Sequence, residues 1–200
     1  MIKQSLKYLL NLLSQLLVFP LVALCKLEEI LFSKDVEFIF NICTHILALQ
    51  PGVPGAFLRR GFYSLILDEC SAHCHIGFGT IFSHRYSKVG KHVYIGSYSI
   101  IGSSELGDHC LIGSRVSILS GKALHVRGDD GTWTPYSADR LSQVKLADNV
   151  WIGEGAIIAA DVGEGSMVGA GSVVTTNICS HVIMAGNPAR FVKKLDDNNT

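Results

Sequence analysis

From Ile76 onward, the chain repeats an aliphatic residue followed by glycine or another small residue at intervals of six. This period cannot keep one face of a helix apolar, because an α-helix turns once in about 3.6 residues. Short strands joined by tight turns fit the pattern, with the aliphatic side chain of each hexad pointing inward. The phase slips by a residue or two at Val89, Leu106 and Val162. The repeated positions are Ile76, Phe82, Val89, Ile95, Ile101, Leu106, Ile112, Ile118, Leu146, Ile152, Ile158, Val162, Val168 and Val174.

A second set of positions supports the same fold. Four residues after these aliphatics stand small or β-branched residues, with Glu105 as an exception. One coil of short strands cannot bury its own core, so coils must stack, and the length of the repeat predicts roughly four of them. The small or β-branched positions are Thr80, Val93, Ser99, Cys110, Val116, Val150, Ala156, Ser166 and Ser172.

The N-terminal third is apolar without this period. Residues 5–25 are nearly long enough to span a bilayer, but Lys7, Asn11 and Pro20 interrupt them. We expect an interfacial helix that contacts a membrane surface. The alternatives are that this helix and a second one over residues 36–49 cover one end of the folded domain, or that the first helix is a membrane span or a signal.

Proline and glycine residues, which end helices and permit turns, indicate the remaining boundaries. Residues 51–55 read as a turn, and residues 57–67 as a short helix or strand. The sequence therefore predicts an N-terminal helical segment over residues 1–67, a β-helix over 68–192 with a loop excursion at 120–143, and a C-terminal tail over 193–200.

The excursion is the feature that most suggests function. A long break in a compact stack is typical of a lid or a binding loop. Gly121, Gly128 and Gly131 give backbone freedom, Asp129 and Asp130 offer hydrogen-bond acceptors, and Trp133 with Tyr136 supplies apolar surface. One histidine, His125, lies near the base, and an imidazole is the natural proton acceptor near neutral pH.

Composition excludes some partners. The 200 residues have 48% hydrophobic content and a formal net charge of zero, so we expect no nucleic-acid partner. Six cysteines without a regular framework indicate a reducing cytoplasm. The local cluster Cys70, His73, Cys74 and His75 suggests a zinc site, but it lacks spaced ligand pairs, so we expect ordinary packing and no metal.

Three stretches, IGSYSIIG, WIGEGAIIAADVGEGSMVGAGSVVTTNI and AGNPAR, resemble the hexapeptide-repeat acyltransferases, and the likeness covers about residues 76–195. The resemblance implies a left-handed parallel β-helix, a homotrimer, acetyl-CoA as acyl donor, and direct transfer without an acyl-enzyme. It also implies that His125 is the general base, with His84 as the other candidate. The positions that it implies for the donor are Trp151, Glu154, Ala170, Ser172, Thr175, Arg190 and Lys193.

The activity expected from this resemblance is O-acetylation of a sugar hydroxyl in an envelope polysaccharide or its precursor, at the inner face of the cytoplasmic membrane. An N-acetyltransferase for a nucleotide-linked amino sugar, or a serine or xenobiotic acetyltransferase, is the alternative within the enzymes. A catalytically silent trimeric scaffold and a metal-bearing carbonic anhydrase relative are alternatives of other classes. The sequence leaves the acceptor open, because acceptor pockets are built from loops and interfaces.

Overall fold

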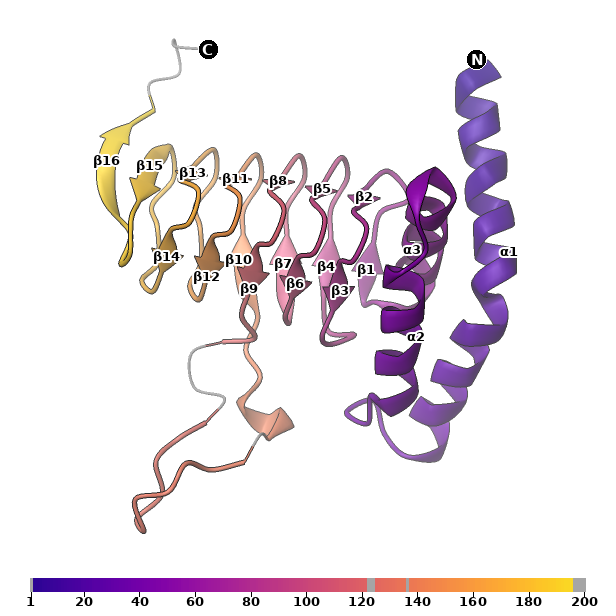
Figure 1. Cartoon of the computed structure of the whole chain (residues 1–200), viewed down its shortest axis with the longest axis horizontal. Coiled ribbons are helices and arrows are strands. Elements are labelled where there is room, and N and C mark those ends of the chain that lie inside the picture. The colour runs from indigo at the N-terminus through magenta and orange to yellow at the C-terminus, as the bar shows by residue number, and fades with distance from the viewer. Residues whose placement is uncertain (1, 122–124, 136, 196–200) are drawn as a thin grey trace.

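Three helices cover one end of a parallel β-helix in the computed structural model (Figure 1), which describes residues 2–121, 125–135 and 137–195. The predicted fold class is confirmed: a mainly β stack of hexapeptide repeats follows an N-terminal helical region, and one long excursion leaves the stack. The helices are α1 (Ile2–Leu31), α2 (Phe38–Ala48) and α3 (Gly52–Ile66).

The strands form three parallel sheets, one for each side of the coil. Sheet A contains β1 (Glu69–Cys70), β4 (Lys88–Val89), β7 (Ser104–Leu106) and β10 (Val144–Leu146). Sheet C contains β3 (Ile81–Phe82), β6 (Ile100–Ile101), β9 (Ser117–Ile118), β12 (Ile157–Ile158) and β14 (Val173–Val174).

Sheet B is the longest and ends in one antiparallel strand. It contains β2 (His75–Ile76), β5 (Tyr94–Ile95), β8 (Leu111–Ile112), β11 (Trp151–Ile152), β13 (Met167–Val168), β15 (Val182–Ala185) and β16 (Arg190–Lys194). Only β16 pairs antiparallel, with β15. Sheet B therefore counts six parallel turns, more than the four that we predicted from the repeat.

The turns at the two ends of the stack are harder to recognise, because an inward position holds a cysteine or a methionine there. The first turn places Cys70 in register with Val89, and the last places Met184 in register with Val168. Cysteine and methionine fill these inward positions as apolar side chains. The predicted series included Ile76 and Phe82 of the first turn but not Cys70, and it stopped at Val174, so it held only four complete sets of three inward residues.

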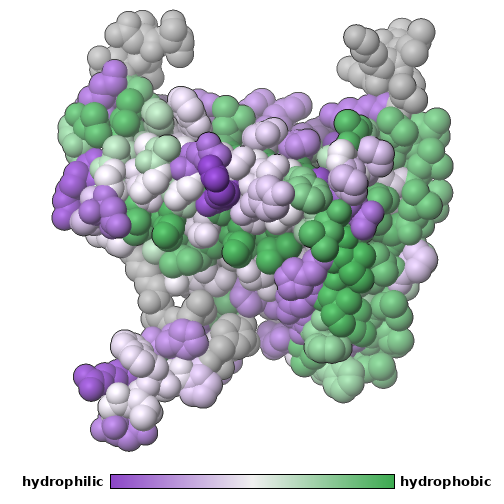
Figure 2. Space-filling view, in the orientation of Figure 1, coloured by the Kyte–Doolittle hydropathy of each residue, from purple (hydrophilic) through white to green (hydrophobic). Residues whose placement is uncertain are grey.

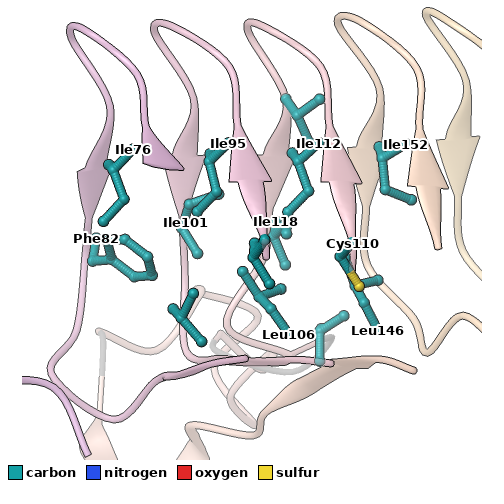
Figure 3. Close-up of a cluster of buried hydrophobic side chains, with 14 of the residues drawn as sticks. Ile76, Phe82, Ile95, Ile101, Leu106, Cys110, Ile112, Ile118, Leu146 and Ile152 are labelled. Carbon is teal, nitrogen blue, oxygen red and sulfur yellow. The ribbon is translucent and has the colours of Figure 1, made fainter. Parts of the chain in front are cut away.

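The core is built from the predicted columns. Ile95 is paired with Ile76 on one side and Ile112 on the other, and all three are fully buried. Figure 3 shows such side chains from facing strands meeting inside the stack. The small residues of the second set, such as Thr80 and Ser99, are also buried, as predicted.

Helix α3 begins earlier than the sequence suggested. Residues 51–55, predicted as a turn, include the first turn of this helix, where a proline is tolerated. Pro54 has no N–H to donate, and N–H groups in the first turn have no helical carbonyl as partner, so no intrahelical hydrogen bond is lost. A side chain at Gly55 would place its Cβ 1.9 Å from the Gln50 carbonyl oxygen. Glycine at this position therefore lets α3 start directly against the end of α2.

A buried ion pair fastens the helices to the first coil. Arg85 follows β3 and is fully buried; its guanidinium donates to Glu28 Oε2 of α1 at 2.8 Å. The other oxygen of Glu28 accepts from the backbone N–H of Ile39 in α2 at 2.7 Å. Glu37 adds a second link, because its carboxylate accepts from the backbone N–H of Arg85 and bonds His84 Nδ1.

We predict that Arg85→Met lowers the free energy of unfolding by about 3–5 kcal/mol, because it leaves the Glu28 carboxylate buried without its cation. The matched control is Arg115→Met, which removes an exposed ion pair with Glu154 and should cost about 0–1 kcal/mol. Urea unfolding followed by circular dichroism measures the two values. Equal losses would show that the Arg85 network does not hold the helices in place.

Candidate functional site

The excursion is a hairpin that projects away from the stack (Figure 1). It leaves after β9, and the coil closes behind it, because the Ser142 N–H donates to the Ser120 carbonyl at 3.2 Å. Within it, Arg127 and Trp133 form an antiparallel bridge, and the Thr134 N–H donates to the Val126 carbonyl at 2.8 Å. A short 3₁₀ helix, η1 (Ala138–Arg140), lies on the return path.

The tip of the hairpin uses the polar residues that the sequence singled out. Gly131 has φ of 80°, a conformation that favours glycine. Asp130 accepts hydrogen bonds from the backbone and hydroxyl of Thr132, and these bonds lower the pKa of the Asp130 carboxyl. Trp133 is largely exposed, whereas Tyr136 lies outside the described residues.

The base of the hairpin fixes His125. Its Nδ1 lies 2.9 Å from the carbonyl oxygen of Thr134, which can only accept a hydrogen bond. Nδ1 of the neutral ring must therefore carry the proton, and Nε2 keeps its lone pair. The side chain is exposed, so the geometry presents a proton acceptor to whatever docks at the base of the hairpin.

Thr134 is a residue that our sequence analysis missed. Its Oγ1 accepts from the Val126 N–H at 3.0 Å and from the Arg140 guanidinium, so the threonine joins the two arms of the hairpin to η1. The excursion has no sequence repeat from which strand pairing could be predicted. Only Asp130 and Gly131, which are typical turn residues, are consistent with a hairpin in the sequence.

A cavity of about 290 Å³ opens at the root of the excursion, where sheet C leads into sheet A. Gly121 has φ of 99°, a conformation that favours glycine, and a Cβ there would lie 2.0 Å from Ser142 Oγ on the returning chain. The cavity also reaches two turns toward the C-terminus along the same edge. Its lining includes Gly121, Ser142, Val144, Ala159, Ala160 and Asn177.

Apart from His45 in α2, the other histidines lie on the coil or its edges. His84, our second candidate, is partly buried and bonds the Glu37 carboxylate at 2.7 Å, so it joins the first coil to the start of α2. His75 stacks on Tyr94, and burial lowers the pKa of its imidazole. His92 stacks between His73 and His109 along one edge.

Two of the predicted donor residues lie on or just after sheet B. Trp151 points outward from β11 between Leu111 and Met167 of the neighbouring strands, and about half of its surface is exposed. Glu154 follows at the next edge and forms an ion pair of 3.0 Å with Arg115. That cation offsets the charge that would otherwise repel an anionic ligand.

The predicted small residues divide between surface and interior. Ala170 is exposed at the edge between sheets B and C, whereas Ser172 is fully buried and its Oγ accepts from the Gly186 N–H at 3.0 Å. Thr175 is exposed where sheet C ends, on the edge that carries the root of the excursion. The predicted donor residues therefore occupy more than one edge of a single chain.

The predicted cations lie together on the last strand. Arg190 and Lys193 belong to β16, and Lys194 adjoins them; all three are exposed. This strand closes the C-terminal end of sheet B, so its positive charge is available to an anionic ligand such as a phosphate.

Among the residues that the structure describes, no group of three or more histidine, cysteine, aspartate or glutamate side chains is arranged to hold a metal ion. In the suspected cluster, the sulfurs of Cys70 and Cys74 lie 3.8 Å apart, while His73 and His75 stack on rings of the next coil.

Comparison with known proteins defines the class. The family model described as the hexapeptide repeat of succinyl-transferase matches residues 87–119 and 143–176, on both sides of the excursion. Together with the fold, this match confirms the resemblance to the hexapeptide-repeat acyltransferases over the matched repeats.

Individual relatives agree with this assignment. A Saccharomyces cerevisiae protein named by inference as an acetyltransferase is 29% identical over 58% of this chain and 62% of its own length. A Schizosaccharomyces pombe protein named in the same way is 41% identical over 27% of each chain. This chain thus spans less than two thirds of the length of these curated relatives.

Solved structures share the fold. A maltose O-acetyltransferase from Clostridium difficile 630 superposes with a TM-score of 0.67 at 24% identity, covering 79% of this chain and 86% of that one. A galactoside acetyltransferase in complex with coenzyme A gives a TM-score of 0.63 at 18% identity, covering 80% of each chain.

Proposed function

We propose that this chain is an acetyl-CoA-dependent O-acetyltransferase that acts on a sugar hydroxyl of an envelope polysaccharide or its precursor. The observation that carries the proposal is the hydrogen bond from His125 Nδ1 to the Thr134 carbonyl, which leaves Nε2 free to accept a proton. The names of the curated relatives and of the superposed structures support acetyl transfer.

In the proposed reaction, His125 Nε2 takes the proton of the acceptor hydroxyl while its oxygen attacks the thioester carbonyl carbon. The carbon–sulfur bond then breaks, and the imidazolium returns the proton to the departing thiolate, so that an ester and free coenzyme A result. No acyl-enzyme is required, because the acceptor attacks directly. The Thr134 carbonyl stabilises the imidazolium by accepting from Nδ1 throughout.

We propose that the donor extends from the root of the excursion toward β16. Arg190 and Lys193 would bind its phosphates, which require positive charge, and Thr175 would line the arm. Trp151, Glu154 and Ala170 would contact it from a neighbouring chain, since they lie on sheet B and on the edge between sheets B and C, away from Thr175. Ser172 would act indirectly, because its buried hydroxyl holds the Gly186 backbone in place.

An amine acceptor would use the same base, so N-acetylation of a nucleotide-linked amino sugar, or of serine or a xenobiotic, is the second candidate reaction. Thiol release from acetyl-CoA, measured against a panel of sugars and amines, distinguishes these activities. A silent scaffold would release no thiol above the rate of hydrolysis with any acceptor.

We predict that His125→Ala lowers turnover by about 100-fold or more while the protein stays folded and assembled, because a surface base contributes to the transition state and little to the core. His181→Asn is the matched control: it changes an exposed histidine with φ of 57°, and Asn149 already holds that conformation on another coil. Acetyl transfer by the two purified variants decides the matter. Unchanged turnover in His125→Ala would assign the base to another residue, with His84 next to be tested.

We further propose a homotrimer, in which sheets B and C contact neighbouring chains and sheet A faces water. Outward positions of sheets B and C expose apolar side chains, including Tyr94, Leu111, Trp151, Ile100 and Ile157. Sheet A instead carries a ladder of charges, with ion pairs of 2.9 Å between Lys88 and Glu69 and between Lys145 and Glu105. Charged residues are depleted from the cores of protein interfaces, and apolar residues are enriched there. The apolar rows therefore support sheets B and C, rather than sheet A, as the contact faces.

We predict that Leu111→Glu converts the trimer to a monomer, because it buries an unpaired charge at the contact. Lys145→Gln, an outward change on sheet A, should leave the trimer intact. Light scattering after size-exclusion chromatography gives both masses. A trimeric Leu111→Glu protein, or a monomeric wild type, would contradict the assignment of the faces.

The N-terminal helix supports contact with a membrane surface, which would place the enzyme at the cytoplasmic face where acetyl-CoA and a lipid-linked acceptor meet. Helix α1 has two apolar stripes. One packs on the domain through Val18, Val22 and Cys25, and the other exposes Leu12, Leu16, Phe19, Leu27 and Ile30. Figure 2 shows the apolar surface continuing over the helical end. Such a contiguous patch marks an interaction site.

The same helix is long and apolar enough to cross a bilayer over Lys7–Leu31. Its packing argues for lying on the surface instead, because the stripe facing α3 is already occupied by the domain. A spanning helix would have to give up those contacts.

We predict that the double change Leu16→Glu and Ile30→Glu lowers binding to vesicles of phosphatidylglycerol and phosphatidylethanolamine by about tenfold or more, since each exposed side chain loses apolar burial in the lipid. Phe191→Glu, an equally exposed position on β16, should bind as the wild type does. Co-sedimentation measures all three proteins. A wild-type protein that stays in the supernatant would refute membrane contact.

A further inference from the structure

A pair of cysteines faces each other at the first corner of the stack. Cys70 ends β1 and Cys74 stands just before β2, and their sulfurs lie 3.8 Å apart. The chain between them turns tightly: the Cys74 N–H donates to the Ser71 carbonyl at 3.3 Å, and the His73 N–H to Ser71 Oγ at 3.1 Å. The backbone thus holds the two thiols in contact.

The same corner in the other turns shows what is special here. Corresponding inward pairs lie four residues apart in each turn, and in the described turns only the first has two cysteines. The others combine aliphatic residues with each other or with one small residue. The pairs are Val89 and Val93, Leu106 and Cys110, Leu146 and Val150, Val162 and Ser166, and Ile178 and Val182.

A buried cation lies over this corner. Arg60 of α3 donates from Nη1 to the Cys74 carbonyl at 3.2 Å, and its Nη2 bonds Asn11 Oδ1 of α1. Among the described residues, none of its contacts is a carboxylate, and its buried Nε has no hydrogen-bond partner. A buried guanidinium without a counter-ion is costly, so the site favours a negative charge nearby.

The thiol pair can supply that charge. The hydrogen bond from Cys70 lowers the pKa of the Cys74 thiol, and the Arg60 charge adds to the effect against the cost of burial. Arg60 in turn gains from the charge on either sulfur. The first proton therefore leaves the pair more readily than from an isolated buried thiol, and the remaining proton is shared between the two sulfurs.

We propose that Cys70 and Cys74 form a redox-active dithiol that reacts with small disulfides, such as glutathione disulfide, to give an internal disulfide bond. A disulfide needs a sulfur–sulfur distance of about 2.05 Å, so the contact closes by side-chain rotation. Cys70 is the entry point, because it is partly exposed while Cys74 is 3% exposed.

The reaction balances in two exchanges. Cys70, the more accessible of the two, passes its proton to the Cys74 thiolate across the 3.8 Å contact and attacks one sulfur of glutathione disulfide, which breaks the S–S bond and releases one glutathione thiolate. Cys74 then gives up its proton and attacks the Cys70 sulfur, which expels the second glutathione. The two cysteines lose two electrons and two protons, and the oxidant becomes two glutathione molecules.

Tryptic digestion separates the cysteines conveniently, because Cys70 and Cys74 share peptide 61–85 while each of the others falls on its own peptide. The full chain is incubated with glutathione disulfide at pH 7, quenched with an alkylating agent and digested. We expect peptide 61–85 to lose two hydrogens and resist alkylation, about tenfold faster than exposed Cys179 gains glutathione. Cys25 and Cys43, which are both buried, should stay reduced.

Two variants test the roles within the pair. Cys70→Ser should leave Cys74 unmodified, since the entry thiol is gone, and Arg60→Gln should slow oxidation to the rate at Cys179. The proposal fails if peptide 61–85 of the wild type keeps two alkylatable thiols after Cys179 has fully reacted. A glutathione adduct at Cys70 that never resolves into the internal disulfide would overturn it as well.

Discussion

The register between successive coils is the constraint on which the rest of this structure depends. Each coil lays its inward side chains directly on those of the coil before, and backbone hydrogen bonds such as that from the Leu111 N–H to the Val150 carbonyl, 2.8 Å long, keep the two aligned. The excursion does not disturb this register, because Leu146 pairs with Leu106 and Ile152 with Ile112 across the interruption. A hairpin can therefore carry His125, the proposed base, without disturbing the inward columns of the core.

The same constraint sorts the outside of the molecule. Outward positions also repeat from coil to coil, so one kind of side chain accumulates along each sheet: charges on sheet A and apolar side chains on sheets B and C. A stack with two apolar sides has two surfaces to share with copies of itself. The first coil has no preceding coil to cover its inward side chains. Helices α1 to α3 cover that end of the stack instead.

What the sequence predicted follows from this repetition. The inward columns, the small residues between them and the excursion are periodic features or breaks in a period, and the structure confirms them. The Arg85 to Glu28 ion pair joins residues 57 positions apart, and no period connects them. Helix α1 shows a limit of another kind, because Val18 packs on the domain and Leu16 is exposed although both are apolar. Thr134 acts through its backbone carbonyl, which no residue type reveals.

The central claim is that the hairpin holds His125 through Nδ1 and presents Nε2 as the base. Nitrogen-15 NMR of the uniformly labelled protein tests this directly, at a pH high enough for the imidazole to be neutral. The His125→Gln variant assigns the signals. We predict that the neutral ring carries its proton on Nδ1, as the 2.9 Å contact with the Thr134 carbonyl requires. A ring protonated on Nε2, or one that exchanges evenly between the two tautomers, would contradict the account.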